Sequence, residues 1–162
     1  MVKGSPQQDL SLLTKSKNGL QYLTANDWAL IADKAARQQF KAGDPIVQRG
    51  RRTHGIFVLL SGAASVQFGA QTSVRNIGAG EICGEISFLD ELPATANVAA
   101  NTAVEALYLD RPLLKSLIEL YPHLGSRFYH SLASILSRRL REMIGPHEEA
   151  APAIPASKKT AK

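Results

Sequence analysis

Residues 80–98 read GEICGEISFLDELPATANV, and this segment is the most informative stretch of the chain. It joins an apolar strand to a tight turn at Gly84, a short amphipathic piece, a proline and a second strand. A glycine before a first helical turn leaves backbone N–H groups without helical partners, so that they point at an anion. Gly84, Ile86 and Ser87 are placed in this way, and Glu85 beside them is suited to accept a hydrogen bond from a sugar hydroxyl. The segment indicates either a sugar-phosphate site or a structural short helix, because short helices that begin at glycine are common.

Glycines punctuate the sequence around this segment. Eight of the 12 glycines fall between Gly43 and Gly84, and turns at such short intervals indicate short strands. The expected strands cover residues 45–48, 56–60, 63–68, 72–77, 95–101 and 104–109. Many short strands separated by glycine turns are typical of an antiparallel β jelly roll or a small barrel.

One helix is expected before the strands and two after them, which makes the fold class α+β. Thr24 followed three residues later by Asp27 nearly forms a capping box and predicts a helix over residues 25–36. Asp110 is suited to cap a helix that runs to Leu120 and that Pro122 ends.

The last helix begins directly after Pro122 and carries an apolar stripe at spacings of three and four. The stripe consists of Leu124, Phe128, Leu132, Ile135, Leu136, Leu140 and Met143. We expect it to pack on the strands, or to present its end to a second copy of the chain as a homodimer contact. In either case this helix has a packing partner.

Both ends of the chain are polar. Residues 1–22 are expected to be partly ordered, with Leu10, Leu12 and Leu13 in a short docking helix. Residues 145–162 contain three prolines and no aromatic residue, so we expect a disordered tail. The predicted domain therefore covers residues 23–144.

Composition excludes several classes of protein. The hydrophobic fraction is 44% and the charged fraction 20%, as in an ordinary globular domain, and the formal net charge of +5 suits anionic partners. No apolar run approaches the roughly 18 residues of a transmembrane helix, and no signal peptide is evident, so a cytoplasmic location without membrane contact is expected. Cys83 is the only cysteine and is expected to be a buried hydrophobe rather than a reactive thiol.

Motifs for catalysis and metal binding are not found. The four histidines, at positions 54, 123, 130 and 147, lack the spacing that brings ligands together on a metal. The sequence also contains no nucleophile elbow, Walker loop or G-x-G-x-x-G motif. We therefore expect no catalytic residue and no metal site, and the chain is not expected to be an enzyme.

Several motifs in the same order resemble the cyclic nucleotide-binding domain family, which includes catabolite-activator-type regulators and protein kinase A regulatory subunits. The motifs are F-x-A-G-D at 40–44, F-V-L-x-S-G at 57–62, G-x-G-E-x-x-G-E-I-S at 78–87 and P-x-T-A-x-V at 93–98. The resemblance extends over about residues 23–144. It implies an eight-stranded jelly roll flanked by helices, with the last helix acting as a lid or dimer contact.

The resemblance also implies a site for a cyclic nucleotide, cAMP or cGMP. Its candidate residues are Gly84, Glu85, Ile86, Ser87, Ala94 and Thr95. By this resemblance Gly84 and the amides of Ile86 and Ser87 face the cyclic phosphate. Glu85 meets the ribose 2′-hydroxyl, and Thr95 meets the purine edge or the phosphate.

One position departs from the family pattern. Members that bind these nucleotides usually carry an arginine directly after the proline of this motif, where this chain has Ala94. Loss of an arginine–phosphate pair is expected to weaken binding by roughly 10- to 100-fold or more. Asp90 and Glu91 are expected to add negative charge near the phosphate. Seven arginines are weighed as substitutes, each expected to be solvated rather than in the pocket: Arg49, Arg51, Arg52, Arg75, Arg138, Arg139 and Arg141.

Two functions remain open from the sequence. Only 18 residues follow Ile144, so a helix-turn-helix and sequence-specific DNA binding are not expected. The first hypothesis is a stand-alone regulatory domain that senses a cyclic nucleotide or related anion and acts through a protein partner or dimerisation. The second is a ligand-independent interaction or dimerisation module that has kept the fold and lost nucleotide affinity.

Overall fold

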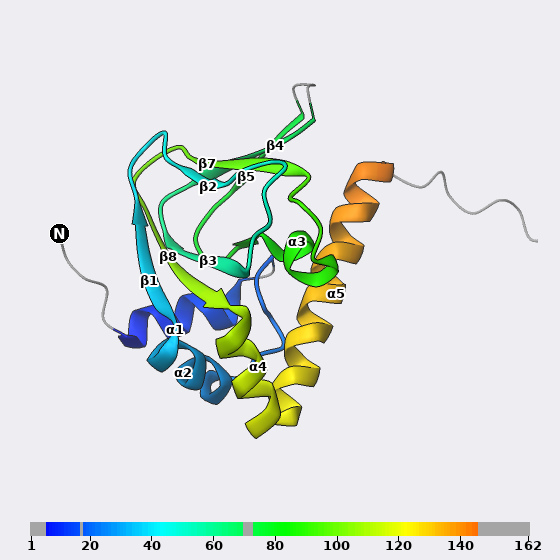
Figure 1. Ribbon diagram of the computed structural model, residues 1–162. Coiled ribbons are helices and arrows are strands. Elements are labelled where there is room, and N and C mark those ends of the chain that lie inside the picture. The colour runs from blue at the N-terminus through cyan, green and yellow to red at the C-terminus, as the bar shows by residue number, and fades with distance from the viewer. Residues whose placement is uncertain (1–5, 17, 70–72, 146–162) are drawn as a thin grey trace, which may run out of the picture.

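The computed structural model describes residues 6–16, 18–69 and 73–145. Within them the strands form two four-stranded sheets that face each other, and every strand pairing is antiparallel (Figure 1). The first sheet has the order β1 (Ala36–Phe40), β8 (Val104–Asp110), β3 (Gly55–Ser61), β6 (Ile82–Cys83). The second has the order β2 (Pro45–Val47), β7 (Ala96–Ala100), β4 (Ala64–Phe68), β5 (Ser73–Ile77). The predicted antiparallel jelly roll with flanking helices is confirmed.

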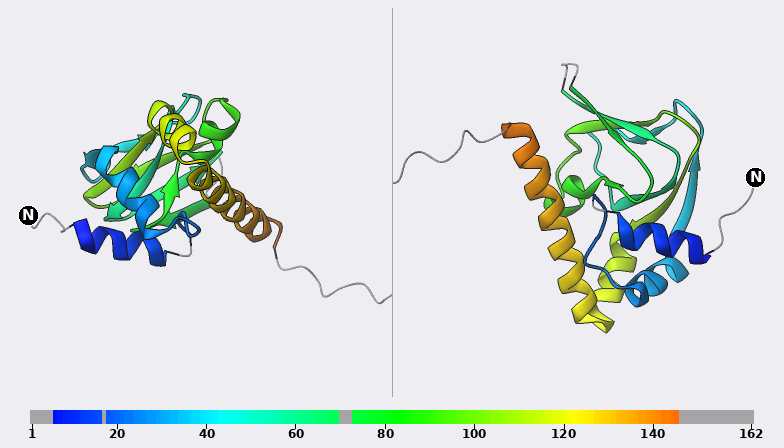
Figure 2. Two further views of the ribbon diagram at one scale, coloured as in Figure 1. Left: turned by 90° about the horizontal axis from the view of Figure 1, so that it is seen from below. Right: turned by 180° about the vertical axis from the view of Figure 1, so that it is seen from behind.

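The helices cover one end and one side of the sheets. They are α1 (Pro6–Lys15), α2 (Ala25–Lys34), α3 (Glu85–Asp90), α4 (Arg111–Leu120) and α5 (Pro122–Ile144). In Figures 1 and 2, α1, α2 and α4 gather at one end, while α5 runs past α3 along the side of the sheets. Across the described part of the chain, no helix combines the length and the apolar character needed to cross a membrane.

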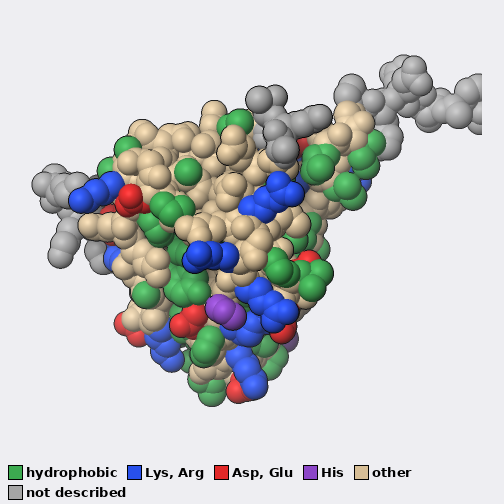
Figure 3. Space-filling view, turned by 45° about the horizontal axis from the view of Figure 1, so that its top comes forward, with side chains coloured by type: hydrophobic (Ala, Val, Ile, Leu, Met, Phe, Trp, Pro, Cys, Tyr) green, Lys and Arg blue, Asp and Glu red, His purple; other side chains and the backbone are tan. Residues whose placement is uncertain are grey.

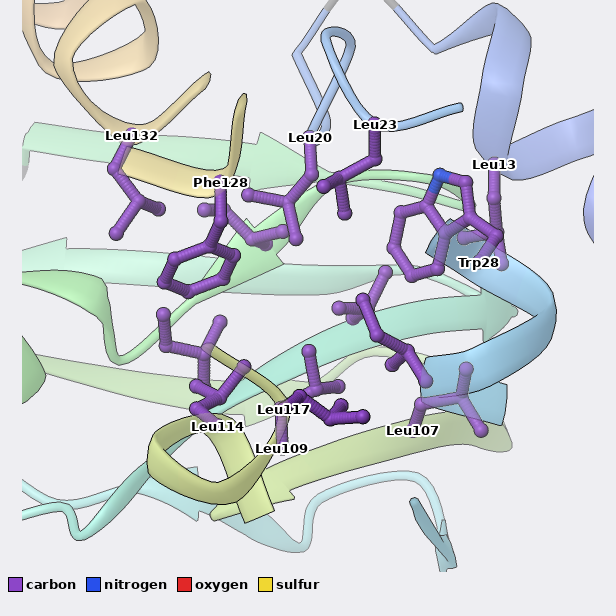
Figure 4. Close-up of a cluster of buried hydrophobic side chains, with 14 of the residues drawn as sticks. Leu13, Leu20, Leu23, Trp28, Leu107, Leu109, Leu114, Leu117, Phe128 and Leu132 are labelled. Carbon is purple, nitrogen blue, oxygen red and sulfur yellow. The ribbon is translucent and has the colours of Figure 1, made fainter. Parts of the chain in front are cut away.

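Strand β3 explains why there are two hydrophobic cores. Six of its seven residues are buried, so both faces of the strand are covered. Because side chains alternate between the faces of a strand, Ile56 and Val58 join the helices in one cluster, and Phe57 and Leu59 join the second sheet in another. Figure 4 shows the first cluster, in which Trp28 of α2 and Phe128 of α5 lie against the sheet.

Local signals in the sequence set the starts of the main helices. Thr24 and Asp27 form a complete capping box at α2, and Asp110 caps α4 by accepting a hydrogen bond from the Leu113 amide at 2.8 Å. Pro122 stands after the end of α4 and also begins α5, where its missing N–H costs nothing. These predictions are confirmed, except that α2 ends at Lys34 instead of residue 36.

The two remaining predictions about the chain ends have different outcomes. A helix, α1, does form near the N-terminus. It docks on the domain through Leu13, which is 1% exposed and belongs to the core that the helices share with the sheet. The tail predicted over residues 145–162 lies outside the described residues after Gly145.

Cys83 is buried as predicted, and its burial raises the pKa of the thiol far above the ordinary range.

Candidate functional site: a pocket between the sheet and the last helix

A cavity of about 860 Å³ lies between the second sheet, the start of α3 and the C-terminal half of α5. Most of its wall is apolar, with Val47, Val66 and Val98 on strands and Leu140 and Met143 on α5. We call this cavity the α5 pocket. The end of the apolar stripe on α5, which the sequence offers as a dimer contact, lines this pocket instead of packing in the core.

The structure brings all six candidate residues to the wall of this one pocket: Gly84, Glu85, Ile86, Ser87, Ala94 and Thr95. They come from two segments, the turn into α3 and the segment before β7. Their contacts with a ligand remain predictions, since their placement only shows that one small molecule within the pocket can reach them together.

The turn at Gly84 has a backbone that suits glycine. Its φ is 86°, in the left-handed region, and a Cβ added there would lie 3.1 Å from the Gly55 carbonyl oxygen. The Thr53 hydroxyl donates a hydrogen bond to the Gly84 carbonyl at 3.3 Å, and the Thr53 amide donates one to Ser87 Oγ at 3.1 Å. Ser87 Oγ in turn donates to the Leu92 carbonyl at 2.5 Å. The Ser87 hydroxyl therefore holds the loop together, which leaves its backbone amide as the group available to an anion.

Glu85 has a partner that the sequence did not indicate. Its carboxylate forms an ion pair with Arg139 of α5, and the Glu85 side chain is 4% exposed against 17% for Arg139. Arg139 also donates from Nη2 to the Ile82 carbonyl at 2.9 Å, while its Nε is buried without a hydrogen-bond partner. The expectation that Arg139 is a solvated surface charge is therefore wrong. This arginine ties α5 to both ends of the turn that precedes α3.

Ala94 lies in the pocket wall and is 7% exposed. Its amide donates to the Arg51 carbonyl at 2.8 Å, and its carbonyl accepts from the Gly50 amide at 2.8 Å. Seven arginines are candidates to replace the arginine that the family pattern places at position 94, and of these Arg75 and Arg139 line the pocket. Arg49, Arg51 and Arg52 are exposed and lie outside its wall.

Asp90 at the end of α3 and Glu91, its C-cap residue, do not line the pocket. Asp90 Oδ1 accepts a hydrogen bond from the Leu92 amide at 3.0 Å. Glu91 forms an ion pair with Arg111, with 3.3 Å between Glu91 Oε1 and Arg111 Nη1. The Arg111 guanidinium also lies over the Phe88 ring, 4.6 Å from its centroid. The expectation that Asp90 and Glu91 add negative charge at the phosphate position is therefore not supported by their placement.

The charges on one face of the described residues are spread rather than gathered into one patch (Figure 3). On the face shown in Figure 3, Lys and Arg side chains lie in separate groups among hydrophobic and acidic ones. A single basic stripe, as expected for a nucleic-acid-binding face, is not seen there. Within the described ranges, no three His, Cys, Asp or Glu side chains lie close enough to hold a metal ion.

The chain is similar to known proteins along most of its length. The family model for the cyclic nucleotide-binding domain matches residues 37–121. Cyclic GMP-binding protein C of Dictyostelium discoideum is 28% identical over 130 residues, which are 78% of this chain and 5% of that protein. The cyclic AMP receptor protein of Thermus thermophilus is 32% identical over 110 residues, 65% of this chain and 49% of that protein. The chain thus spans half or less of the length of these two relatives.

Solved structures agree on the fold. A cyclic nucleotide-binding domain from Methylobacillus flagellatus superposes with a TM-score of 0.71 at 21% identity, covering 84% of this chain and 78% of that one. At this identity the likeness concerns the fold alone. The family model ends at residue 121, just before α5, so Arg139 lies outside the matched region.

Proposed function

This chain belongs to the cyclic nucleotide-binding domain family, and we propose that it is a regulatory domain that senses a cyclic nucleotide or a related anion in the α5 pocket. One observation carries the proposal. The Gly84 turn, Glu85 and Thr95 line a single cavity whose opposite side is formed by the long helix α5. A ligand in that cavity touches the sheet and α5 at once, so it has the means to bias the position of α5.

The proposed affinity for cAMP or cGMP is weak. Ala94 supplies no charge to a phosphate, and the guanidinium nearest the Gly84 turn, that of Arg139, is already paired with Glu85. A charge-assisted pair contributes about twice as much as a neutral hydrogen bond. The pocket therefore has the shape for a nucleotide and lacks part of the electrostatic attraction.

The output is proposed to pass through α5. The last two turns of this helix expose Leu140, Met143 and Ile144, which are 57%, 75% and 62% exposed. A protein partner or a second copy of the chain would bury these side chains. No catalytic step is assigned to the domain.

A second candidate function is a ligand-independent interaction module. The Glu85–Arg139 ion pair favours it, because the carboxylate assigned to the ribose already has a partner without any ligand. In that case α5 is held against the sheet permanently, and the exposed end of α5 is the functional surface.

Calorimetric titration of the native protein with cAMP and cGMP, each to millimolar concentration, separates the two functions. Saturable binding with a dissociation constant in the micromolar range supports the sensor. Absence of heat and of any thermal shift at millimolar ligand rejects the nucleotide sensor and leaves the interaction module. Sedimentation at high concentration adds the oligomeric state, and a 17.5 kDa monomer alone rejects the dimer.

A further inference from the structure

Arg75 of β5 lines the α5 pocket from the side of the sheet, with a guanidinium that is only loosely paired. Its Nη2 lies 3.5 Å from Glu81 Oε1, and its Nη1 lies 3.6 Å from Glu142 Oε2 on α5. Charge-assisted hydrogen bonds between such groups are normally about 2.7–2.9 Å long. Neither carboxylate therefore uses the donors of Arg75 fully.

The two arginines of the pocket differ in how easily they give up a carboxylate. The Glu85 side chain is 4% exposed, so it would be left as a buried charge if Arg139 turned away. The Glu142 side chain is 55% exposed and returns to water without such a penalty. Glu81 is held in place separately, since its Oε2 accepts from the Gly78 amide at 2.7 Å. Exchange of a carboxylate for another anion is thus possible at Arg75 and opposed at Arg139.

Charge balance makes this exchange necessary. Four charged side chains line the pocket: Arg75, Arg139, Glu85 and Glu142. Two positive and two negative groups leave no net side-chain charge to attract an anion unless one carboxylate leaves. The group that leaves at least cost is Glu142.

We infer that Arg75 binds the anionic group of the ligand in this pocket, and that Glu142 of α5 is an internal competitor which the ligand displaces. The inference rests on the proposed function in that the ligand occupies the α5 pocket. It defines the ligand as an anion, such as a phosphate ester, whose remaining body packs on apolar side chains including Val66, Val98 and Leu140. Arg75 then takes the part of the arginine that is absent at position 94.

Two charge-neutralising variants test the inference by titration with cAMP, cGMP and inorganic phosphate. Arg75→Gln is expected to weaken anion binding by about tenfold or more, because a charge-assisted contact is lost. Glu142→Gln is expected to strengthen anion binding by about two- to fivefold, because the Glu142 carboxylate no longer competes for Arg75 and an exposed ion pair is worth only that much. Arg49→Gln and Glu119→Gln change the same charges at exposed sites outside the pocket, and both are expected to leave affinity unchanged.

The outcomes separate this inference from the proposed function. Nucleotide binding that is equal in native protein and Arg75→Gln, or unchanged in Glu142→Gln, overturns the inference and leaves the sensor. Phosphate binding that depends on Arg75, without nucleotide binding, supports the inference and rejects the nucleotide. Absence of binding by all three probes to native protein and Glu142→Gln overturns both. If Arg75→Gln does not fold, Arg75→Lys replaces it and is expected to keep anion binding. Loss of anion binding in Arg75→Lys, together with no gain of affinity in Glu142→Gln, overturns the inference.

Discussion

Arg127 of α5 donates two parallel hydrogen bonds to Asp27 of α2, from Nε to Oδ2 and from Nη2 to Oδ1, each 2.7 Å long. Asp27 Oδ2 also accepts from the Thr24 amide at 2.8 Å, so the same carboxylate caps α2 and fixes the start of α5 to it. The hydrogen bonds from Arg127 hold the pKa of Asp27 below its ordinary value, against the opposing effect of burial. One carboxylate thus joins two helices that are far apart in the sequence.

Substitution of Asp27 is expected to lower the stability of the fold in a pH-dependent way. Asp27→Asn should reduce the free energy of unfolding by about 2 kcal/mol at pH 7, since bonds between charged partners are lost. Because the folded pKa is lowered, the contribution of Asp27 is complete above the ordinary aspartate range, about pH 4, and disappears as the pH falls through the folded pKa. Urea unfolding of native protein and Asp27→Asn, at pH 7 and between pH 5 and 2.5, measures both effects.

Asp33→Asn is the matched control, because Asp33 lies on the same helix and its side chain is exposed. It is expected to change the free energy of unfolding by less than about 0.5 kcal/mol. If Asp27→Asn and native protein lose stability in parallel as the pH falls, then Asp27 does not act through its charge.

Much of the fold could be predicted from the sequence where signals are local. The caps at Thr24 and Asp110, together with Pro112 and Pro122, determine where helices begin, and such signals need no tertiary context. Strands β3 and β8 could be predicted because they are long and apolar. The sequence does not predict strand β1, because its residues, ARQQF, are mostly polar and half exposed, and the strand is stabilised by pairing with β8 far along the chain.

The candidate site could be predicted only in part, because some of its contacts join residues that are far apart in the sequence. Gly84, Glu85 and Thr95 lie within one short segment, so motif spacing brings them together. The Glu85–Arg139 ion pair joins residues 54 positions apart, and α5 carries several arginines that look alike in the sequence. Which arginine faces the pocket depends on how α5 packs on the hydrophobic cluster between the helices and the first sheet. The sequence pattern does not specify this packing.

Gly84→Ala is expected to destabilise the fold and to disturb the site. An alanine at φ 86° costs about 1–2 kcal/mol, and its Cβ would lie 3.1 Å from the Gly55 carbonyl on a buried strand. Gly43→Ala is the control, since its φ is 92° and no atom lies within 4 Å of an added Cβ. Chemical denaturation should give a larger loss for Gly84→Ala than for Gly43→Ala. Equal losses would mean that only the backbone conformation matters.

The Glu85–Arg139 pair should behave as a coupled buried pair. Glu85→Gln and Arg139→Gln are each expected to cost about 3 kcal/mol, because each leaves a charge without its partner in a buried place. The double variant is expected to cost clearly less than the sum, and a double-mutant cycle by chemical denaturation measures the difference. Glu105→Gln, at the more exposed pair with Arg37, is expected to cost about 1 kcal/mol or less. Additive losses at Glu85 and Arg139 would contradict a direct interaction.

Ala94→Arg is expected to increase affinity for cAMP and cGMP by roughly 10- to 100-fold. Ala94 lines a cavity of about 860 Å³, so a longer side chain has room to extend toward the amides that follow Gly84. There its guanidinium would form charge-assisted bonds with the cyclic phosphate. Calorimetric titration of native protein and Ala94→Arg with both nucleotides measures the gain.

Ala94→Gln distinguishes charge from size, because glutamine also fills the cavity but carries no charge. It is expected to bind no more tightly than native protein, and thermal unfolding of both variants checks that the fold is kept. If Ala94→Arg folds and still binds neither nucleotide at millimolar concentration, then the missing arginine is not what limits binding. The ion pair that holds Glu85 would then be the remaining obstacle, and titration of Ala94→Arg combined with Arg139→Gln tests it directly.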